Sequence, residues 1–284
     1  MSYPEKHIAL VCNPGPHNDK ALRITDDVAL LLTGMGISHS VFTAFWPTVW
    51  EGITDAWVIG GDGTINHFIN QYPEFGLPIA VFAGGSGNDF HWMLYGEKNI
   101  EAQVELVLQQ EPRFVDAGIC NGRLFLNGVG IGFDGAIVRD TAGKKKAAGK
   151  ASYLLSILKH IAAYHEKRCL IRLPCENIEQ DCFMISIANA KRYGGGYLVA
   201  PRAVVTDGLL DVNIIGRITP LSRLRYLPVI EKGDHLNLPF IQYRQDTKVF
   251  ISCASGLHAH IDGEYIFADA FEIRLLPKRF SFVY

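Results

Sequence analysis

Two glycine-rich stretches contain the residues whose types and spacing best suit chemistry. The first, Gly60-Gly61-Asp62-Gly63-Thr64, follows a short apolar run and precedes a stretch typical of a helix. Glycine has no Cβ, so the backbone N–H groups of such a loop can approach a ligand closely. A loop of this kind, between the carboxyl end of a strand and the start of a helix, is a natural phosphate cradle. We therefore expect Asp62 and Thr64 to act on a nucleotide phosphate.

A second glycine-rich stretch, Gly84-Gly85-Ser86-Gly87-Asn88-Asp89-Phe90, follows the next apolar run along the chain. A single glycine cluster is most often only a tight turn, so neither stretch alone indicates a ligand. Loops that follow strands of one parallel sheet lie at its carboxyl edge, where ligands bind in the crevice. The repetition therefore predicts that both loops face one bound molecule.

The elements that must position these loops follow from the hydrophobic pattern. Strands are predicted at residues 7–12, 37–43, 55–59 and 78–82, and helices at 19–35 and 65–71. Strands that alternate with helices in this way indicate a parallel, doubly wound sheet. The N-terminal part of the chain is therefore predicted to be a Rossmann-like α/β domain.

The pattern changes after about residue 111, where short strands dominate. Residues 113–119 and 123–129 flank Asn121-Gly122, a dipeptide that predicts a β-hairpin because it tolerates positive φ angles. Further strands are predicted at 169–173, 182–189, 209–215, 248–253, 257–261 and 271–276, and helices at 152–165 and 220–232. This part is predicted to be a largely antiparallel sandwich or barrel. Its glycine-rich segment 127–135 is interpreted as closely packed backbone.

Composition limits the class of protein. With 284 residues, 48% of them hydrophobic and 20% charged, the chain can bury a full core and is long enough for two domains. Its 27 basic and 29 acidic residues give no reason to expect nucleic acid as a partner. We therefore expect a soluble globular protein, and a homodimer is compatible with the sequence.

Three features favour a cytoplasmic location. No uncharged apolar run approaches the about 18 residues that span a bilayer. The N-terminus, from Met1 to Lys6, lacks the apolar core of a signal peptide. The six cysteines show no C-x-x-C pair or metal-ligand spacing, so reduced and mostly buried thiols are expected.

One basic cluster precedes the helix predicted at residues 152–165, and it consists of Lys144, Lys145, Lys146 and Lys150. It has two interpretations. One is a solvated helix start; the other is a peripheral contact with anionic lipid headgroups on the inner face of a membrane.

The second domain contains two candidate sites. Asp207-Gly208-Leu209-Leu210-Asp211 is either a turn that leads into a strand, which the residues alone favour, or a site for a hard cation. The run His258-Ala259-His260-Ile261-Asp262-Gly263-Glu264 would place its two histidines and two acids on one face of a strand. The run resembles the start of the metallo-β-lactamase zinc signature, but Gly263 stands where that signature has a further histidine and the other expected ligands are not evident, so zinc is disfavoured. Glu264 is instead a candidate general base for a hydroxyl substrate.

The ordered set of these motifs resembles the diacylglycerol kinase catalytic-domain family, and the bacterial lipid kinases of that family are closest in length and layout. The set comprises Gly60 to Asn66, Gly85 to Phe90, Asp116, Asn127, Asp207-Gly208 and Asp262-Gly263-Glu264. The first loop alone is shared with NAD kinases. The resemblance implies an NAD kinase/diacylglycerol kinase-like fold, with a nucleotide-binding α/β domain (1–119) and an antiparallel β-sandwich lipid domain (120–276). It places ATP in the cleft between the domains and lets residues 277–284 return to the first.

The resemblance also implies roles for single residues. The implied ATP contacts are Asn13, Thr43, Gly60, Gly61, Asp62, Gly63, Thr64, Ile65, Asn66, Gly85 and Ser86. Phosphates and Mg2+ would be positioned by Asp62, Asn88, Asp89 and Asp116, and Glu264 would be the catalytic base. A structural Mg2+ would be held by Asp207 with the backbone carbonyls of Val204 and Leu209, which reverses the preference for a plain turn.

The sequence departs from the family pattern at three positions. His67 stands where the family usually has glutamate, Trp92 stands where it has arginine, and Ser86 replaces a threonine but keeps the hydroxyl. The first two changes put phosphate or metal contacts in doubt.

Three functions therefore remain. The leading one is an ATP-dependent kinase that phosphorylates a membrane lipid such as diacylglycerol or a sphingoid base. The second is a soluble metabolite kinase resembling NAD kinase, which Gly87-Asn88-Asp89-Phe90 in the second loop disfavours. The third is an inactive nucleotide- or lipid-binding regulator.

Overall fold

The computed structural model describes residues 6–13, 19–141 and 160–284. Internal contacts divide the chain into two units: unit 1 comprises Met1–Asp116 with Pro277–Tyr284, and unit 2 comprises Ala117–Leu276. The chain leaves unit 1 within strand β5 (Arg113–Cys120) and returns to it within strand β14 (Glu264–Phe282). Unit 1 therefore contains both ends of the sequence.

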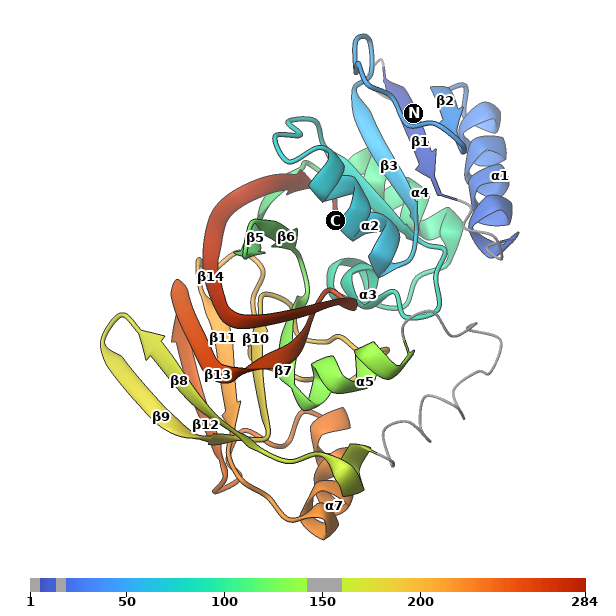
Figure 1. The fold of residues 1–284 in the computed structure, drawn as a ribbon. Helices are drawn as coiled ribbons and strands as arrows, with labels where there is room; N and C mark the ends of the chain where they lie inside the picture. The colour runs from blue at the N-terminus through green and yellow to red at the C-terminus, as the bar shows by residue number, and fades with distance from the viewer. Residues whose placement is uncertain (1–5, 14–18, 142–159) are drawn as a thin grey trace. The chain divides into compact units, whose positions relative to one another are not determined.

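The centre of unit 1 is a parallel sheet (Figure 1). Its strands are β1 (His7–Cys12), β2 (Ser38–Phe42), β3 (Asp55–Gly60) and β4 (Ile79–Ala83), in the order β2-β1-β3-β4. At the far side of β4, Phe282 at the end of β14 pairs in parallel with Ile79. All six residues of β3 are buried, as expected for a central strand covered on both faces. The predicted doubly wound α/β arrangement is confirmed.

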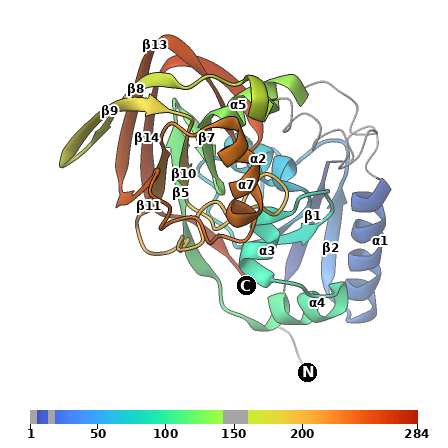
Figure 2. The ribbon, with the colours of Figure 1, turned by 90° about the horizontal axis from the view of Figure 1, so that it is seen from below.

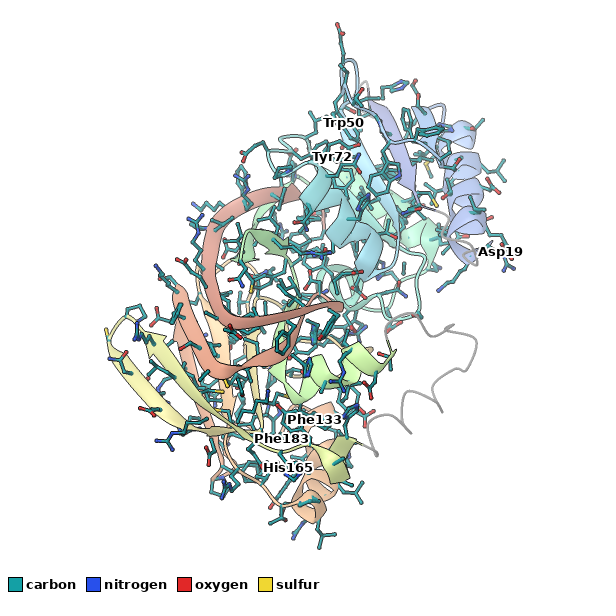
Figure 3. All side chains as sticks on the ribbon, viewed as in Figure 1. Asp19, Trp50, Tyr72, Phe133, His165 and Phe183 are labelled. Atoms are coloured by element: carbon teal, nitrogen blue, oxygen red, sulfur yellow. The ribbon has the colours of Figure 1, made fainter. Side chains whose placement is uncertain are left out.

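Four helices cover the sheet of unit 1, namely α1 (Asp19–Gly34), α2 (Asp62–Gln71), α3 (Asp89–Tyr95) and α4 (Ile100–Gln109). Helices α1 and α4 contact each other on one face, while α2 packs on β3 and contacts α3 (Figures 1 and 2). Aromatic side chains fill the space beside α2, where Trp50 and Tyr72 lie edge to face at 5.2 Å (Figure 3). Helices α3 and α4 were not predicted from the sequence.

Unit 2 is built from antiparallel strands (Figure 1). They include β7 (Gly128–Gly132), β10 (Met184–Ala188), β11 (Leu210–Ile215), β12 (Ile241–Asp246) and β13 (Lys248–Ile261), in the order β12-β11-β10-β7-β13-β14. The first part of β13 pairs with β8 (Lys167–Leu173), which forms a hairpin with β9 (Glu176–Cys182). Two helices accompany the strands, α5 (Phe133–Thr141) and α7 (Pro220–Glu231).

Several predictions for unit 2 need correction. The strand predicted at 123–129 is two strands, β6 (Arg123–Phe125) and β7, because the backbone N–H groups between them bond to a side chain. The strands predicted at 248–253 and 257–261 form one long strand, β13, with an irregularity between Ser252 and Leu257. Helix α5 was not predicted, nor were the polar strands β9 and β12.

The glycine-rich segment 127–135 is closely packed, as predicted. A Cβ on Gly135 of α5 would lie 2.2 Å from the backbone nitrogen of Ala259 in β13. A Cβ on Gly130 would lie 2.4 Å from Nε2 of His260. Glycine at position 135 lets α5 lie directly against β13, and glycine at position 130 of β7 leaves room for the side chain of His260.

Some predictions fall outside the described residues. These are the basic cluster Lys144, Lys145, Lys146 and Lys150 and most of the helix predicted at 152–165, of which residues 160–163 are described and helical. Within the described part of the chain, no helix is long and apolar enough to cross a membrane.

Candidate active site

The residues predicted to contact ATP gather at one edge of the sheet in unit 1. Asn13 follows β1, Thr43 follows β2, and the two glycine loops follow β3 and β4. Parallel strands end at the same edge, so the fold brings these four segments together. The strand order reverses between β1 and β3, and such a switch point is where open α/β sheets bind ligands.

The two glycine loops touch through their backbones. The N–H of Gly84 donates to the carbonyl oxygen of Gly60 at 2.9 Å. A Cβ on Gly85 would lie only 2.4 Å from Cα of Gly61, and a Cβ on Gly60 would lie 2.4 Å from Oγ1 of Thr64. No larger residue fits at these points, so the glycines allow two loops to form one surface.

Asp62 joins the first loop to the helix that follows the second. Its Oδ2 accepts a hydrogen bond from the backbone N–H of Asp89 at 3.0 Å, and its Oδ1 accepts one from Phe90 at 2.9 Å. A carboxylate at this place satisfies N–H groups in the first turn of α3, which have no partner within the helix. Asp62 therefore holds the two loops in register.

Asn88 closes the second loop on itself. Its side-chain oxygen accepts from the N–H of Gly85 at 2.8 Å, and its side-chain nitrogen donates to the carbonyl of Gly85 at 3.0 Å. The backbone of Asn88 is left-handed, with φ of 55°, a conformation that asparagine tolerates better than most residues. The amide predicted to position phosphates thus shapes the loop.

The remaining predicted residues of unit 1 differ in exposure. Asn66, Asp89 and Asp116 are buried, and Asp116 accepts a hydrogen bond from the N–H of Lys278 at 2.7 Å. Ser86 and Asn13 are exposed at the edge of the sheet. The structure thus places hydroxyl and amide groups on the surface of the edge and carboxylates beneath it.

His67 and Trp92, the two residues that depart most from the family pattern, lie on helices α2 and α3. His67 is exposed on α2, and its ring lies 5.1 Å from that of Trp46. Trp46 in turn donates from Nε1 to the carbonyl of Cys12 at 3.1 Å, at the end of β1. Trp92 is partly buried in α3. His67 therefore belongs to an aromatic cluster beside the predicted nucleotide edge.

Glu264 begins strand β14 in unit 2, directly after a two-residue turn. Asp262 and Gly263 form that turn with φ of 46° and 86°, the signature of a type I′ hairpin. The carboxylate of Asp262 accepts the backbone N–H groups of Leu126 at 2.8 Å, Asn127 at 3.0 Å and Gly128 at 2.9 Å. The exposed side chain of Glu264 thus follows a turn that is hydrogen-bonded to the start of β7.

The prediction that two histidines, Asp262 and Glu264 share one strand face is wrong, because the turn interrupts the strand. His260 is buried, and its Nδ1 accepts from the N–H of Gly263 at 3.2 Å. His258 lies 2.8 Å from the hydroxyl of Tyr265, and burial together with the charge of Arg139 lowers its pKa. Among the described residues, no three His, Cys, Asp or Glu side chains form a metal-binding group.

The Asp207 turn leads into β11. Oδ1 of Asp207 accepts a hydrogen bond from the N–H of Leu209 at 3.0 Å, and the N–H of Asp207 donates to the carbonyl of Val204 at 3.3 Å. Asp207 is exposed, whereas Asp211, two residues beyond Leu209, is fully buried. The hydroxyl of Tyr243 donates to Oδ1 of Asp211 at 2.6 Å, and burial raises the pKa of Asp211. No separate role for Asp211 was predicted from the sequence.

Family models match both units. The model described as YegS C-terminal NAD kinase beta sandwich-like domain matches residues 127–283, more than half of the chain. The model described as diacylglycerol kinase catalytic domain matches residues 51–120, which include both glycine loops and Asp116. The predicted β-sandwich is confirmed.

Curated relatives have related names. A protein of Mycobacterium tuberculosis named diacylglycerol kinase is 27% identical over 251 residues, which cover 85% of this chain and 80% of the relative. A protein of Pseudomonas aeruginosa named probable lipid kinase YegS-like is 31% identical over 209 residues, which cover 72% of this chain and 68% of the relative.

A solved structure shares the fold. The crystal structure of a putative diacylglycerol kinase from Bacillus anthracis superposes with a TM-score of 0.82, covers 100% of this chain and 96% of its own, and is 22% identical in sequence. At that identity the superposition shows the fold alone, and the family follows from the domain matches and the sequence relatives. The chain therefore belongs to the diacylglycerol kinase and YegS-like lipid kinase family, whose members are phosphotransferases with an alcohol acceptor.

Proposed function

We propose that this protein transfers the γ-phosphate of ATP to the hydroxyl of a membrane lipid such as diacylglycerol or a sphingoid base. The observation that carries the proposal is the joining of two glycine loops at the switch point of a parallel sheet. A surface of backbone without side chains, next to the start of α2, suits a chain of phosphates. The family membership adds the lipid acceptor.

The polar residues of unit 1 would then position the phosphates. Phosphoryl transfer needs little covalent help, so orientation and charge stabilisation supply most of the catalysis. Asp62 and Asn88 fix the shape of the loops through their backbone hydrogen bonds. Thr64 and Ser86 offer hydroxyl groups, and Asp89 and Asp116 offer carboxylates beneath the edge.

We assign the proton-accepting role to Glu264. It would take the proton of the lipid hydroxyl as that oxygen attacks the γ-phosphate. The turn that precedes Glu264 is held by three hydrogen bonds to Asp262, which limits the directions the glutamate can take. A base on a rigid turn loses little freedom when the substrate binds.

Mg2+ would neutralise phosphate charge in this reaction. The carboxylates of Asp62 and Asp89 would suit a Mg2+ that is bound to ATP, because carboxylate oxygens are ligands that hard cations prefer. A second, structural Mg2+ would bind at the turn that contains Val204, Asp207 and Leu209. This turn offers one exposed carboxylate and backbone carbonyls, which are the oxygen ligands that such cations prefer.

Incubation of the pure protein with labelled ATP, Mg2+ and a panel of lipids, with NAD in a parallel reaction, tests the proposal. We expect label in at least one lipid with a free hydroxyl and none in NAD. Transfer to NAD without transfer to any lipid would refute it and support the metabolite kinase. ATP binding without transfer to any acceptor would instead support an inactive regulator.

The base is tested by Glu264→Gln, which keeps the size of the side chain and removes its basicity. We expect kcat to fall by about 10²- to 10⁴-fold while thermal stability stays that of the wild type. Glu272→Gln is the matched control, because Glu272 lies on the same strand with 60% exposure and pairs with Lys248 at the surface. Equal activity of Glu264→Gln and wild type would remove Glu264 from the mechanism.

A further inference from the structure

A buried histidine contacts the turn that precedes Glu264. His260 lies near the end of β13 and is only 4% exposed. Its Nδ1 accepts a hydrogen bond from the backbone N–H of Gly263 at 3.2 Å. A ring nitrogen that accepts an N–H carries no proton, so the proton of the neutral imidazole lies on Nε2. His260 is therefore held in one tautomer, with its accepting nitrogen toward the turn.

Groups on the other side of the ring stabilise this tautomer. Oδ2 of Asp134, at the start of α5, lies 3.8 Å from Nε2 of His260. The hydroxyl of Tyr193 donates to the same oxygen at 3.0 Å, and the Tyr193 ring meets the imidazole edge to face at 5.1 Å. Gly130 leaves space for this meeting, because a Cβ there would lie 2.4 Å from Nε2 and 2.7 Å from Oδ2. A carboxylate beside Nε2 favours a proton on that nitrogen, so Nδ1 stays an acceptor.

The bond from Gly263 restrains the central peptide of the turn. Gly263 is exposed, and no atom lies within 4 Å of the place that a Cβ would take. Glycine also populates both signs of φ, so the peptide between Asp262 and Gly263 can tilt unless a bond holds it. The N–H of Gly263 belongs to this peptide, and Nδ1 of His260 accepts it. His260 thus limits motion of the backbone directly before Glu264.

The two residues of the turn are held in different ways. The carboxylate of Asp262 accepts the backbone N–H groups of residues 126–128, which fixes the first residue of the turn. The second residue, Gly263, has no side chain with which to make such bonds. The contact with His260 takes that place. The direction in which Glu264 leaves the turn therefore depends on both contacts.

We propose that His260 is a positioning residue for phosphoryl transfer, which holds the Asp262–Gly263 peptide so that Glu264 is aimed at the lipid hydroxyl. This inference rests on the assignment of Glu264 as the base in the proposed function. In this role His260 exchanges no proton with the substrate. A displacement of about 1 Å in a reacting group can lower the rate by about 100-fold, so a restrained turn matters for catalysis.

Two substitutions of similar shape separate the hydrogen bond from the packing. In His260→Asn the side-chain oxygen can take the place of Nδ1, whereas His260→Leu has no acceptor. We expect kcat for lipid phosphorylation to fall by about 10- to 100-fold in His260→Leu and by less than about 3-fold in His260→Asn. KM for ATP should not change, because the predicted ATP contacts lie in unit 1. Hydrogen exchange of the Gly263 amide should become about 3- to 10-fold faster in His260→Leu alone.

His235→Leu is the matched control. His235 is a buried histidine of the same unit, and its Nε2 donates to the carbonyl oxygen of Val199 at 3.1 Å. Its replacement should lower the unfolding temperature but leave kcat and the exchange of Gly263 as in the wild type. A double variant gives a further readout: Glu264→Gln should lower kcat by a smaller factor in His260→Leu than in the wild type, since a misaligned base contributes less.

Equal kcat in His260→Leu and the wild type would overturn the inference. An equal loss in His260→Asn and His260→Leu would also overturn it, because the effect would then come from packing. Either result leaves the proposed lipid kinase intact, since that proposal needs only activity of the wild type. If the wild type phosphorylates no lipid, the proposed function fails together with the catalytic role of His260. Exchange of Gly263 then decides separately whether His260 holds the turn.

Discussion

Replacing Asp62 by asparagine tests whether this residue joins the two glycine loops. Asp62 accepts backbone N–H groups of Asp89 and Phe90 at 3.0 and 2.9 Å. Hydrogen bonds to a charged group contribute about 1.5–3 kcal/mol each. Asparagine keeps one oxygen but turns an NH2 group toward the other N–H, so one bond is lost and one donor faces another. We expect the free energy of unfolding of unit 1 to fall by about 2–4 kcal/mol.

Hydrogen exchange read out by peptide or residue measures this loss where it occurs. The backbone amides of Asp89 and Phe90 should lose protection in Asp62→Asn, while the strands of unit 2 keep theirs. Asp27→Asn is the control, because Asp27 is exposed on α1 and its replacement should change stability by less than about 0.5 kcal/mol. Wild-type protection at Asp89 and Phe90 in the Asp62 variant would refute the argument that Asp62 holds the loops together.

Two further predictions concern unit 2. Burial lowers the pKa of His235 below 6.5, so the unfolded chain binds the proton of this histidine more readily than the folded chain does. The stabilisation that is present above pH 6.5 is therefore lost as the pH falls through the lowered pKa. The stability measured by urea unfolding should depend less on pH in His235→Gln than in the wild type, and an unchanged dependence would contradict this. Asp262→Ala removes the acceptor of three N–H groups and places alanine at φ of 46°. The free energy of unfolding should therefore fall by about 3–5 kcal/mol, and the amides of residues 126–128 should lose their protection from hydrogen exchange. Retained protection at these amides would contradict the prediction.

The fold was predictable where the hydrophobic pattern was strong. The buried strands β1, β3 and β4 were found within one residue, because both faces of a central parallel strand are apolar. Helix α3 was missed because it has only seven residues and starts after a left-handed asparagine. Strands β9 and β12 were missed because they alternate partly exposed polar residues, and pairing with neighbouring strands compensates for their weak propensity.

The site was predictable in its residue types but not in all of its contacts. Glycine spacing identified both loops, since close approach of Gly61 to Gly85 excludes other residues. Nothing in the sequence shows that Asp62 bonds to N–H groups 27 and 28 residues further along the chain. Likewise, Asp262 reaches residues that precede it by about 135 positions, and its bonds explain why β6 and β7 are separate strands.

These contacts change how mutants of the acidic residues are to be interpreted. Asp62 and Asp262 each stand beside glycine, and each uses its carboxylate to hold backbone N–H groups of a distant segment. Loss of activity in either variant therefore follows from a displaced loop or turn, even when no phosphate or metal contact is removed. Glu264 is exposed and lies outside these backbone contacts, so its amide variant changes basicity without changing the scaffold. Among the three acids, Glu264 is thus the one whose replacement tests the proposed proton transfer without disturbing the scaffold.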